Sequence, residues 1–165
     1  MKIVVLKFGG TSVGSIKKIK KIAEIIKAHK NKNYKVIVVS SAMSGVTNEL
    51  IKKSREISDS FSDKEYDVLV STGEQVSCSL IAGRLIHNGI KSRSWMAWQI
   101  PILTRGLHNN SRIVQINKNK IIKYLIEGGV PIITGFQGIN ENERVTTIGR
   151  GGSDASAILL AKFFK

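Results

Sequence analysis

Three turns built from small residues are the parts of this sequence best suited to bind an anion. They are residues 9–12 (GGTS), 40–45 (SSAMSG) and 149–154 (GRGGSD). Backbone N–H groups in such turns, and at the start of a following helix, bind phosphate and carboxylate groups. A single turn of this kind is also explained by tight packing. Three of them in one chain, two with a neighbouring cation, favour an anion-binding site.

Two cations accompany these turns. Lys7 lies at the end of an otherwise apolar segment, and Arg150 lies inside the third turn, where it could pair with Asp154. Burying an ammonium group without an anion is costly, so Lys7 either extends to solvent or faces an anionic ligand. Neither GxxxxGK[ST] nor GxGxxG occurs, so the commonest nucleotide-binding motifs are absent.

The segments that position these turns alternate between strand and helix patterns. Strands are predicted at 2–8, 35–40, 92–96, 100–104 and 131–136. Helices are predicted at 15–30, 47–57, 66–88, 116–127 and 153–164, with a loop at 58–64 and an interruption at Thr72-Gly73. Ser15 and Ser153 are the expected N-caps. This alternation predicts an α/β fold with an open, mostly parallel sheet and helices on both faces, binding ligands at the carboxyl ends of the strands.

The net charge of +14 raises the question of a nucleic-acid partner. Residues 1–35 hold ten Lys against one Glu, and many of these lysines share one face of the helix at 15–30. The sequence has no aromatic-rich RNA-binding motif, helix-turn-helix or zinc finger. We therefore interpret the lysines as a solvated helix face, expect no nucleic-acid partner, and expect the positive field to attract small anions.

Length and composition place further bounds on the protein. The 165 residues suit one domain, and no apolar run approaches the ~18–20 residues of a membrane span, so no membrane partner is expected. The single cysteine, Cys78, rules out an internal disulfide and fits a cytoplasmic location. The three histidines are scattered, and we interpret them as surface or structural residues.

Five segments resemble aspartate kinases, in order from the first residue to nearly the last. They are 7–12 (KFGGTS), 41–48 (SAMSGVTN), 71–74 (STGE), 135–138 (GFQG) and 147–154 (TIGRGGSD). The resemblance implies the amino-acid kinase (carbamate kinase-like) fold. It also implies ATP-dependent phosphorylation of the L-aspartate side-chain carboxylate to 4-phospho-L-aspartate, the first step of lysine, threonine and methionine (diaminopimelate) biosynthesis.

The chemistry of that reaction agrees with the residues present. A carboxylate with a pKa near ~3.9 is already ionised at neutral pH, so it needs no general base. The difficulty is to bring two anions together, and cations and N–H donors would solve it. By the resemblance, Lys7 would neutralise the transferring phosphoryl group, while Gly9, Gly10 and Ser12 would contact the phosphates of ATP. Mg²⁺ would bridge these phosphates without a dedicated set of protein ligands.

The remaining residues of the resemblance would bind aspartate. Arg150 would hold its α-carboxylate and Glu74 its ammonium group, while Phe136 would form a wall of the pocket. The expected hydroxyl donors are Ser41, Thr47 and Ser153. Asp154, which we assign to catalysis together with Lys7, would orient either Lys7 or the substrate ammonium. These two alternatives remain open.

The sequence departs from the family in length. Aspartate kinases continue well beyond the helix that follows GRGGSD, into the adenine site and usually into regulatory ACT domains. Residues 1–165 are therefore expected to form a C-terminally truncated amino-acid kinase domain without ACT domains. The strand at 131–136 is expected to form an exposed sheet edge. The chain is either an active kinase, or an inactive remnant or half-enzyme that binds aspartate without turnover. A homo-oligomer or a complementing C-terminal chain could complete the nucleotide site.

Overall fold

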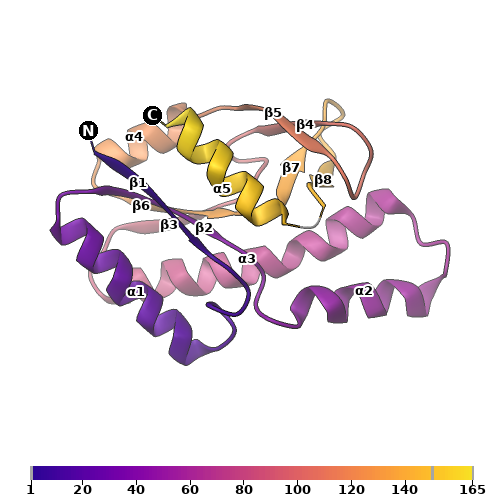
Figure 1. Cartoon of the computed structure of the whole chain (residues 1–165), viewed down its shortest axis with the longest axis horizontal. Coiled ribbons are helices and arrows are strands. Elements are labelled where there is room, and N and C mark those ends of the chain that lie inside the picture. The colour runs from indigo at the N-terminus through magenta and orange to yellow at the C-terminus, as the bar shows by residue number, and fades with distance from the viewer. Residues whose placement is uncertain (1, 150, 165) are drawn as a thin grey trace.

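A four-stranded parallel sheet forms the centre of the molecule (Figure 1). The structure, a computed structural model, describes residues 2–149 and 151–164. The strand order is β1 (Ile3–Phe8), β2 (Lys35–Ser40), β6 (Val130–Thr134) and β3 (Ser92–Trp95). All three pairings are parallel. The apolar runs of β2 and β6 are buried almost throughout, as strands covered on both faces should be.

Helices cover both faces of this sheet (Figure 1). On one face, α1 (Ile16–Asn31) and α3 (Asp63–His87) pack their apolar residues against one set of strand side chains. On the other, α4 (Asn119–Ile126) and α5 (Gly152–Phe163) enclose a second apolar core. The helix α2 (Val46–Ile57) lies beside α3. Within residues 2–149 and 151–164, no helix is long and apolar enough to cross a membrane.

A smaller mixed sheet extends beyond the first. Its order is β5 (Arg112–Ile116), β4 (Ile102–Arg105), β7 (Gln137–Ile139) and β8 (Val145–Thr147). The pairs β4–β5 and β7–β8 are antiparallel, whereas β4 and β7 are parallel. The loop of residues 106–111 joins β4 to β5, and a short loop joins β8 to α5. Both loops are at the functional site described below.

The structure confirms the predicted α/β fold with helices on both faces, and it confirms Ser15 as an N-cap. The side chain of Ser15 accepts a hydrogen bond from Lys18 N at 3.3 Å. Most lysines of α1 are exposed, as expected for a solvated basic face, and Ile19, Ile22, Ala23 and Ile26 are buried, whereas Ile16, predicted on the same apolar face, is exposed.

Several local predictions were wrong. The helix α3 runs without interruption through Thr72-Gly73 and begins at Asp63, inside the predicted loop. The N-cap of α5 is Gly151 rather than Ser153, with a positive φ of 74° that a glycine adopts without a steric cost. The predicted helix 116–127 begins at residue 119, after a strand.

The prediction for the sheet edge was also wrong. The strand predicted at 131–136 is β6, which lies between β2 and β3 in the interior of the sheet. The edge beside the start of the chain belongs to β1, which pairs only with β2 among the described residues. All six residues of β1 are half-buried.

Candidate functional site

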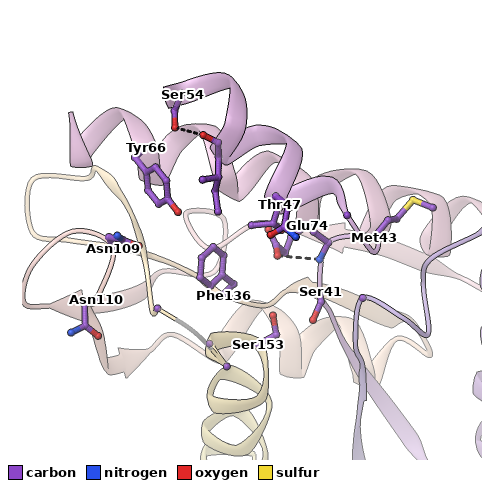
Figure 2. Close-up of a pocket in the computed structure, with 18 of the residues that line it drawn as sticks. Ser41, Met43, Thr47, Ser54, Tyr66, Glu74, Asn109, Asn110, Phe136 and Ser153 are labelled. Atoms are coloured by element: carbon purple, nitrogen blue, oxygen red, sulfur yellow. Dashed lines mark hydrogen bonds between the residues drawn. The ribbon is translucent and has the colours of Figure 1, made fainter. Parts of the chain in front are cut away.

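A cavity of about 870 Å³ lies at the carboxyl ends of β1 and β2, and all three small-residue turns reach it (Figure 2). It extends between α2, the loop 106–111 and the start of α5. Eight of the eleven residues predicted for the site line it: Lys7, Gly10, Ser41, Thr47, Glu74, Phe136, Ser153 and Asp154. Gly9 and Ser12 do not contribute to the lining, and the Ser12 side chain is exposed. Arg150 lies outside the described residues.

One wall of the cavity carries an ion pair. The Nζ atom of Lys7 lies 2.8 Å from Oδ1 of Asp154, joining the end of β1 to the first turn of α5. The Lys7 side chain is about one quarter exposed and the Asp154 side chain about two thirds. An ion pair in contact with water contributes little to stability. The Lys7 ammonium can therefore exchange its carboxylate partner for an anionic ligand at small cost.

The N-termini of two helices reach the same cavity. Gly45 precedes α2 and Gly151 precedes α5, both with positive φ and neither with a side-chain cap. Thr47 and Ser153 are each the second residue of their helix, and both line the cavity. The partial positive charge of a helix N-terminus favours anions. Two such ends in the same cavity as Lys7 make it suited to phosphate and carboxylate groups.

Figure 2 shows Phe136 between Thr47 above it and Ser153 below it, and all three residues line the cavity. The φ of Phe136, 67°, is unusual for a bulky residue and marks local strain of the kind found at binding sites. Phe136 N donates to Ser156 Oγ at 3.2 Å, which holds the strained turn against α5. The preceding residue, Gly135, has no space for a side chain, since a Cβ there would lie 2.8 Å from Cβ of Ser153. This close approach places the start of α5 at the cavity.

Glu74 supplies a buried carboxylate to the cavity wall. The residue is only 3% exposed, and its Oε1 atom accepts a hydrogen bond from Ala42 N at 3.0 Å (Figure 2). Its Oε2 atom is buried without a hydrogen-bond partner. Burial raises the pKa of Glu74 from 4.5 to about 7. A carboxylate that lacks a donor inside a cavity is suited to bind a cationic group such as an ammonium.

Residues that the sequence analysis did not single out form the opposite wall. Asn109 and Asn110 line the cavity from the loop 106–111, and Tyr66 lines it from α3. Neighbouring Asp67 is fully buried and binds this loop. Asp67 precedes Glu74 by two helical turns, so the two carboxylates share a face of α3. This spacing was the one signal in the sequence that could have identified Asp67.

The described residues hold no group of three or more His, Cys, Asp or Glu side chains arranged to bind a metal ion. Two of the acidic groups that line the cavity are already engaged, because Glu74 accepts a hydrogen bond from Ala42 N and Asp154 pairs with Lys7. A divalent cation at this site would therefore need ligands from a bound phosphate. This arrangement fits an ion that arrives with a nucleotide.

The chain belongs to the amino acid kinase family, whose model matches residues 2–165. An aspartokinase of Rickettsia felis is 50% identical to it over the whole chain, which covers 42% of that protein. The aspartate kinase of Synechocystis is 37% identical with a TM-score of 0.81, and the match covers 98% of this chain and 26% of that one. Aspartokinase III of E. coli, solved with aspartate and ADP, gives a TM-score of 0.85 at 25% identity. That match covers 99% of this chain and 47% of that one.

These matches confirm the resemblance to the N-terminal part of aspartate kinases and the amino-acid kinase fold. The homologues are phosphotransferases by name. The chain spans about two fifths of the length of the curated relative it matches.

Proposed function

We propose that this chain is the aspartate-binding part of an aspartate kinase, which transfers the γ-phosphoryl group of ATP to the side-chain carboxylate of L-aspartate. The observation that carries the proposal is the meeting of three features in one cavity. These are the Lys7–Asp154 ion pair, the half-satisfied carboxylate of Glu74, and the N-termini of α2 and α5. An amino acid with two carboxylates needs one ammonium-binding group and several anion-binding groups, and the cavity supplies both.

The substrate end of the cavity is formed by α3 and the turns after β2 and β6. Glu74 would bind the ammonium group through its unpartnered oxygen, and the Ser41, Thr47 and Ser153 hydroxyls would contact the substrate's carboxylates. Figure 2 shows the hydroxyls of Ser41 and Ser153 directed toward the same part of the cavity. Phe136 would limit the length of the side chain that fits. Arg150 is proposed to bind the α-carboxylate on the basis of the GRGGSD motif.

The phosphate end is formed by the turn after β1. Lys7 would neutralise the transferring phosphoryl group, and Asp154 would hold its ammonium in place. Gly9, Gly10 and Ser12 would contact ATP from the same turn. The aspartate oxygen attacks the γ-phosphorus while the bond to the β,γ-bridging oxygen breaks, giving 4-phospho-L-aspartate and ADP. Mg²⁺, bound to the phosphates, would supply further positive charge. Positioning and charge neutralisation account for most of the catalysis in this class of reaction.

The biological setting forms part of the same proposal. Aspartyl phosphate formation in the cytoplasm would begin the synthesis of lysine, threonine and methionine through the diaminopimelate branch. The alternative is binding without turnover, by an inactive remnant or by one half of a split enzyme. This alternative follows from the length of the match, because the chain covers less than half of the Rickettsia felis relative. A second copy of the chain or a complementing C-terminal chain would then complete the nucleotide site.

Two measurements test the proposal. The first is aspartyl phosphate formation from ATP, Mg²⁺ and L-aspartate, trapped as the hydroxamate. The second is the heat of L-aspartate binding, measured by calorimetry. Lys7→Ala is expected to lower turnover by on the order of 10³-fold or more, as loss of a transition-state cation does in other phosphoryl transfers.

The matched control is Lys27→Ala, which removes an exposed lysine of α1 that does not line the cavity. Turnover that Lys7→Ala abolishes and Lys27→Ala leaves intact supports the kinase. Aspartate binding without turnover in folded wild-type protein supports the alternative. Absence of both binding and turnover contradicts the proposal.

A further inference from the structure

Asp67 is a buried carboxylate that the proposed chemistry does not use. It lies in the first half of α3 and is fully buried, with no Lys or Arg ion pair among the described residues. Its two oxygens instead accept hydrogen bonds from three donors. Asn109 N lies 3.0 and 3.1 Å from them, His108 Nδ1 lies 2.7 Å from Oδ2, and Thr147 Oγ1 lies 2.6 Å from Oδ1.

These donors come from two separate segments, the loop 106–111 and the end of β8. His108 and Asn109 belong to the loop 106–111, and Asn109 together with Asn110 lines the cavity. Thr147 is the last residue of β8 and immediately precedes the turn that leads into α5. Ser111 N donates to Thr147 O at 2.9 Å, which joins the two segments directly. Asp67 therefore holds both segments to the same point on α3.

Further contacts extend this junction to the substrate end of the cavity. Ile148 N donates to Phe136 O at 3.0 Å, and Gly152 N donates to Gly149 O at 3.0 Å. Space around Gly149 is limited by the other loop, since a Cβ there would lie 3.3 Å from Asn110 Oδ1. A displacement of Thr147 or of the loop 106–111 would therefore move the residues at the start of α5.

The opposite wall of the cavity is held by a different part of the same helix face. Glu74 accepts from Ala42 N, and Ser77 Oγ donates to Ser41 O at 2.7 Å. Positions 67, 74 and 77 lie on one buried face of α3. This single helix therefore fixes both walls, with Asp67 near its start and Glu74 and Ser77 near its middle.

We infer that Asp67 is a positioning residue for amino-acid binding, which acts by holding the loop 106–111 and residues 147–149 in the geometry that receives the substrate's carboxylates. It does not touch the substrate. The inference rests on the proposed function, because it assumes that the cavity binds L-aspartate. Loss of Asp67 would change the shape of the site without changing the groups that line it.

The test is the Asp67→Asn variant of the whole chain, measured for L-aspartate binding by calorimetry and for local opening by amide hydrogen exchange. The dissociation constant is expected to rise about tenfold with the binding stoichiometry unchanged. Where turnover is measurable, KM for aspartate rises by the same factor and kcat stays within about twofold. A purely structural role would instead lower the stoichiometry or kcat, by reducing the folded fraction, and leave affinity and KM unchanged.

Hydrogen exchange gives a readout that does not depend on substrate. Exchange is expected to accelerate about tenfold or more in 107–110 and 147–149, and to remain unchanged at Ala42 on the opposite wall. If the wild-type chain does not bind aspartate, the proposed function fails, whereas the exchange pattern still decides whether Asp67 holds these segments. Unchanged exchange in both segments overturns the inference, and so does an unchanged dissociation constant in a binding-competent chain.

Two further variants complete the design. Thr147→Val removes one donor with almost no change in shape, and it is expected to give the same pattern at reduced size if Asp67→Asn does not fold. Glu65→Gln is the matched control, because it breaks an exposed ion pair between α3 and Arg144 in the β7–β8 hairpin. It is expected to change the dissociation constant by less than about twofold. An equal effect of Glu65→Gln and Asp67→Asn would contradict a specific role for Asp67.

Discussion

Asp67 and Glu74 are carboxylates on the same buried face of α3, two helical turns apart, but their surroundings differ. Both oxygens of Asp67 accept hydrogen bonds, from three donors in two segments. Glu74 has one oxygen bound to Ala42 N and one without a partner. The two residues are almost equally buried, at 0% and 3% exposure. Burial alone therefore does not distinguish a structural carboxylate from one placed to meet a ligand.

The number of donors around each group makes that distinction. A carboxylate surrounded by donors is stable in its ionised form and helps to hold the fold together. Burial of a carboxyl group with one oxygen lacking a donor destabilises its ionised form, and the raised pKa of Glu74 reflects this burial. The comparison suggests that Asp67 contributes to stability and geometry, whereas Glu74 lowers stability in exchange for binding.

The largest expected effect is on stability, in Asp67→Ala. The substitution leaves three donors near the core without an acceptor, and each costs roughly 1–3 kcal/mol. We expect the free energy of unfolding in urea to fall by about 3–5 kcal/mol, with an unchanged dependence on urea concentration. A loss below about 1 kcal/mol would show that the two segments do not depend on Asp67.

The pH dependence of the free energy of unfolding tests whether the buried carboxylate of Glu74 destabilises the folded chain. Its pKa is about 7 in the folded chain and 4.5 when exposed. The folded state therefore holds more protons than the unfolded state between these values, and stability falls as pH rises from 4.5 to 7. The contribution of this group reaches about 3 kcal/mol. Urea unfolding of the wild type and of Glu74→Gln at several pH values isolates it, because the variant lacks this contribution. Equal pH profiles for the two proteins would contradict the prediction.

The same substitution is expected to weaken ligand binding. Glu74→Gln keeps an acceptor for Ala42 N but loses the charge opposite the substrate ammonium. A charge-assisted hydrogen bond contributes roughly 1.5–3 kcal/mol, so the dissociation constant for L-aspartate should rise about 10- to 100-fold in calorimetry at pH 8. Glu56→Gln, an exposed change on α2, serves as the control. Unchanged affinity in Glu74→Gln would assign the ammonium to another group.

The smallest expected effect is a change with pH in the affinity of the wild-type chain for L-aspartate. Below pH 7 the carboxyl group of Glu74 is mostly protonated, and it must release its proton to bind an ammonium group. The dissociation constant should therefore rise about tenfold between pH 8 and pH 6, and the proton release can be measured in buffers of different ionisation enthalpy. The Glu74→Gln variant should show neither effect. A wild type whose affinity is independent of pH would show that Glu74 is ionised before the ligand arrives.

Local sequence patterns predicted most of the larger sheet and its helices. The strands β1 and β2 and the amphipathic helix α1 with its Ser15 cap are defined by residues close together in the chain. The smaller sheet was harder, because β7 and β8 have only three residues each and depend on distant partners. Gly73 was interpreted as a break in the helix. It instead allows close packing, since a Cβ there would lie 2.7 Å from Cβ of Ala42.

The candidate site was also predicted best where its residues lie close together in the sequence. Residues in recognisable turns, such as Lys7 and Ser153, were identified from the sequence, and the structure brings them together at one cavity. Their individual roles remain predictions. Asp67 was missed because its partners are far away in the sequence, and neither the loop 106–111 nor the motif that begins at Thr147 points to α3. His108 was interpreted only as surface or structural, and nothing in the sequence linked it to Asp67.

The position of β6 has a consequence for how the chain folds. This strand lies between β2 and β3, and Val38 pairs with Ile132 across it. Neither β2 nor β3 can complete its pairing before residues 130–134 have left the ribosome. The pair β1–β2 can form early, whereas the contact between β2 and β6 is made late and over a long sequence separation, which slows folding. We expect the apolar face of α3, which shares a core with Val130 and Ile132, to remain accessible to chaperones until these residues have been synthesised.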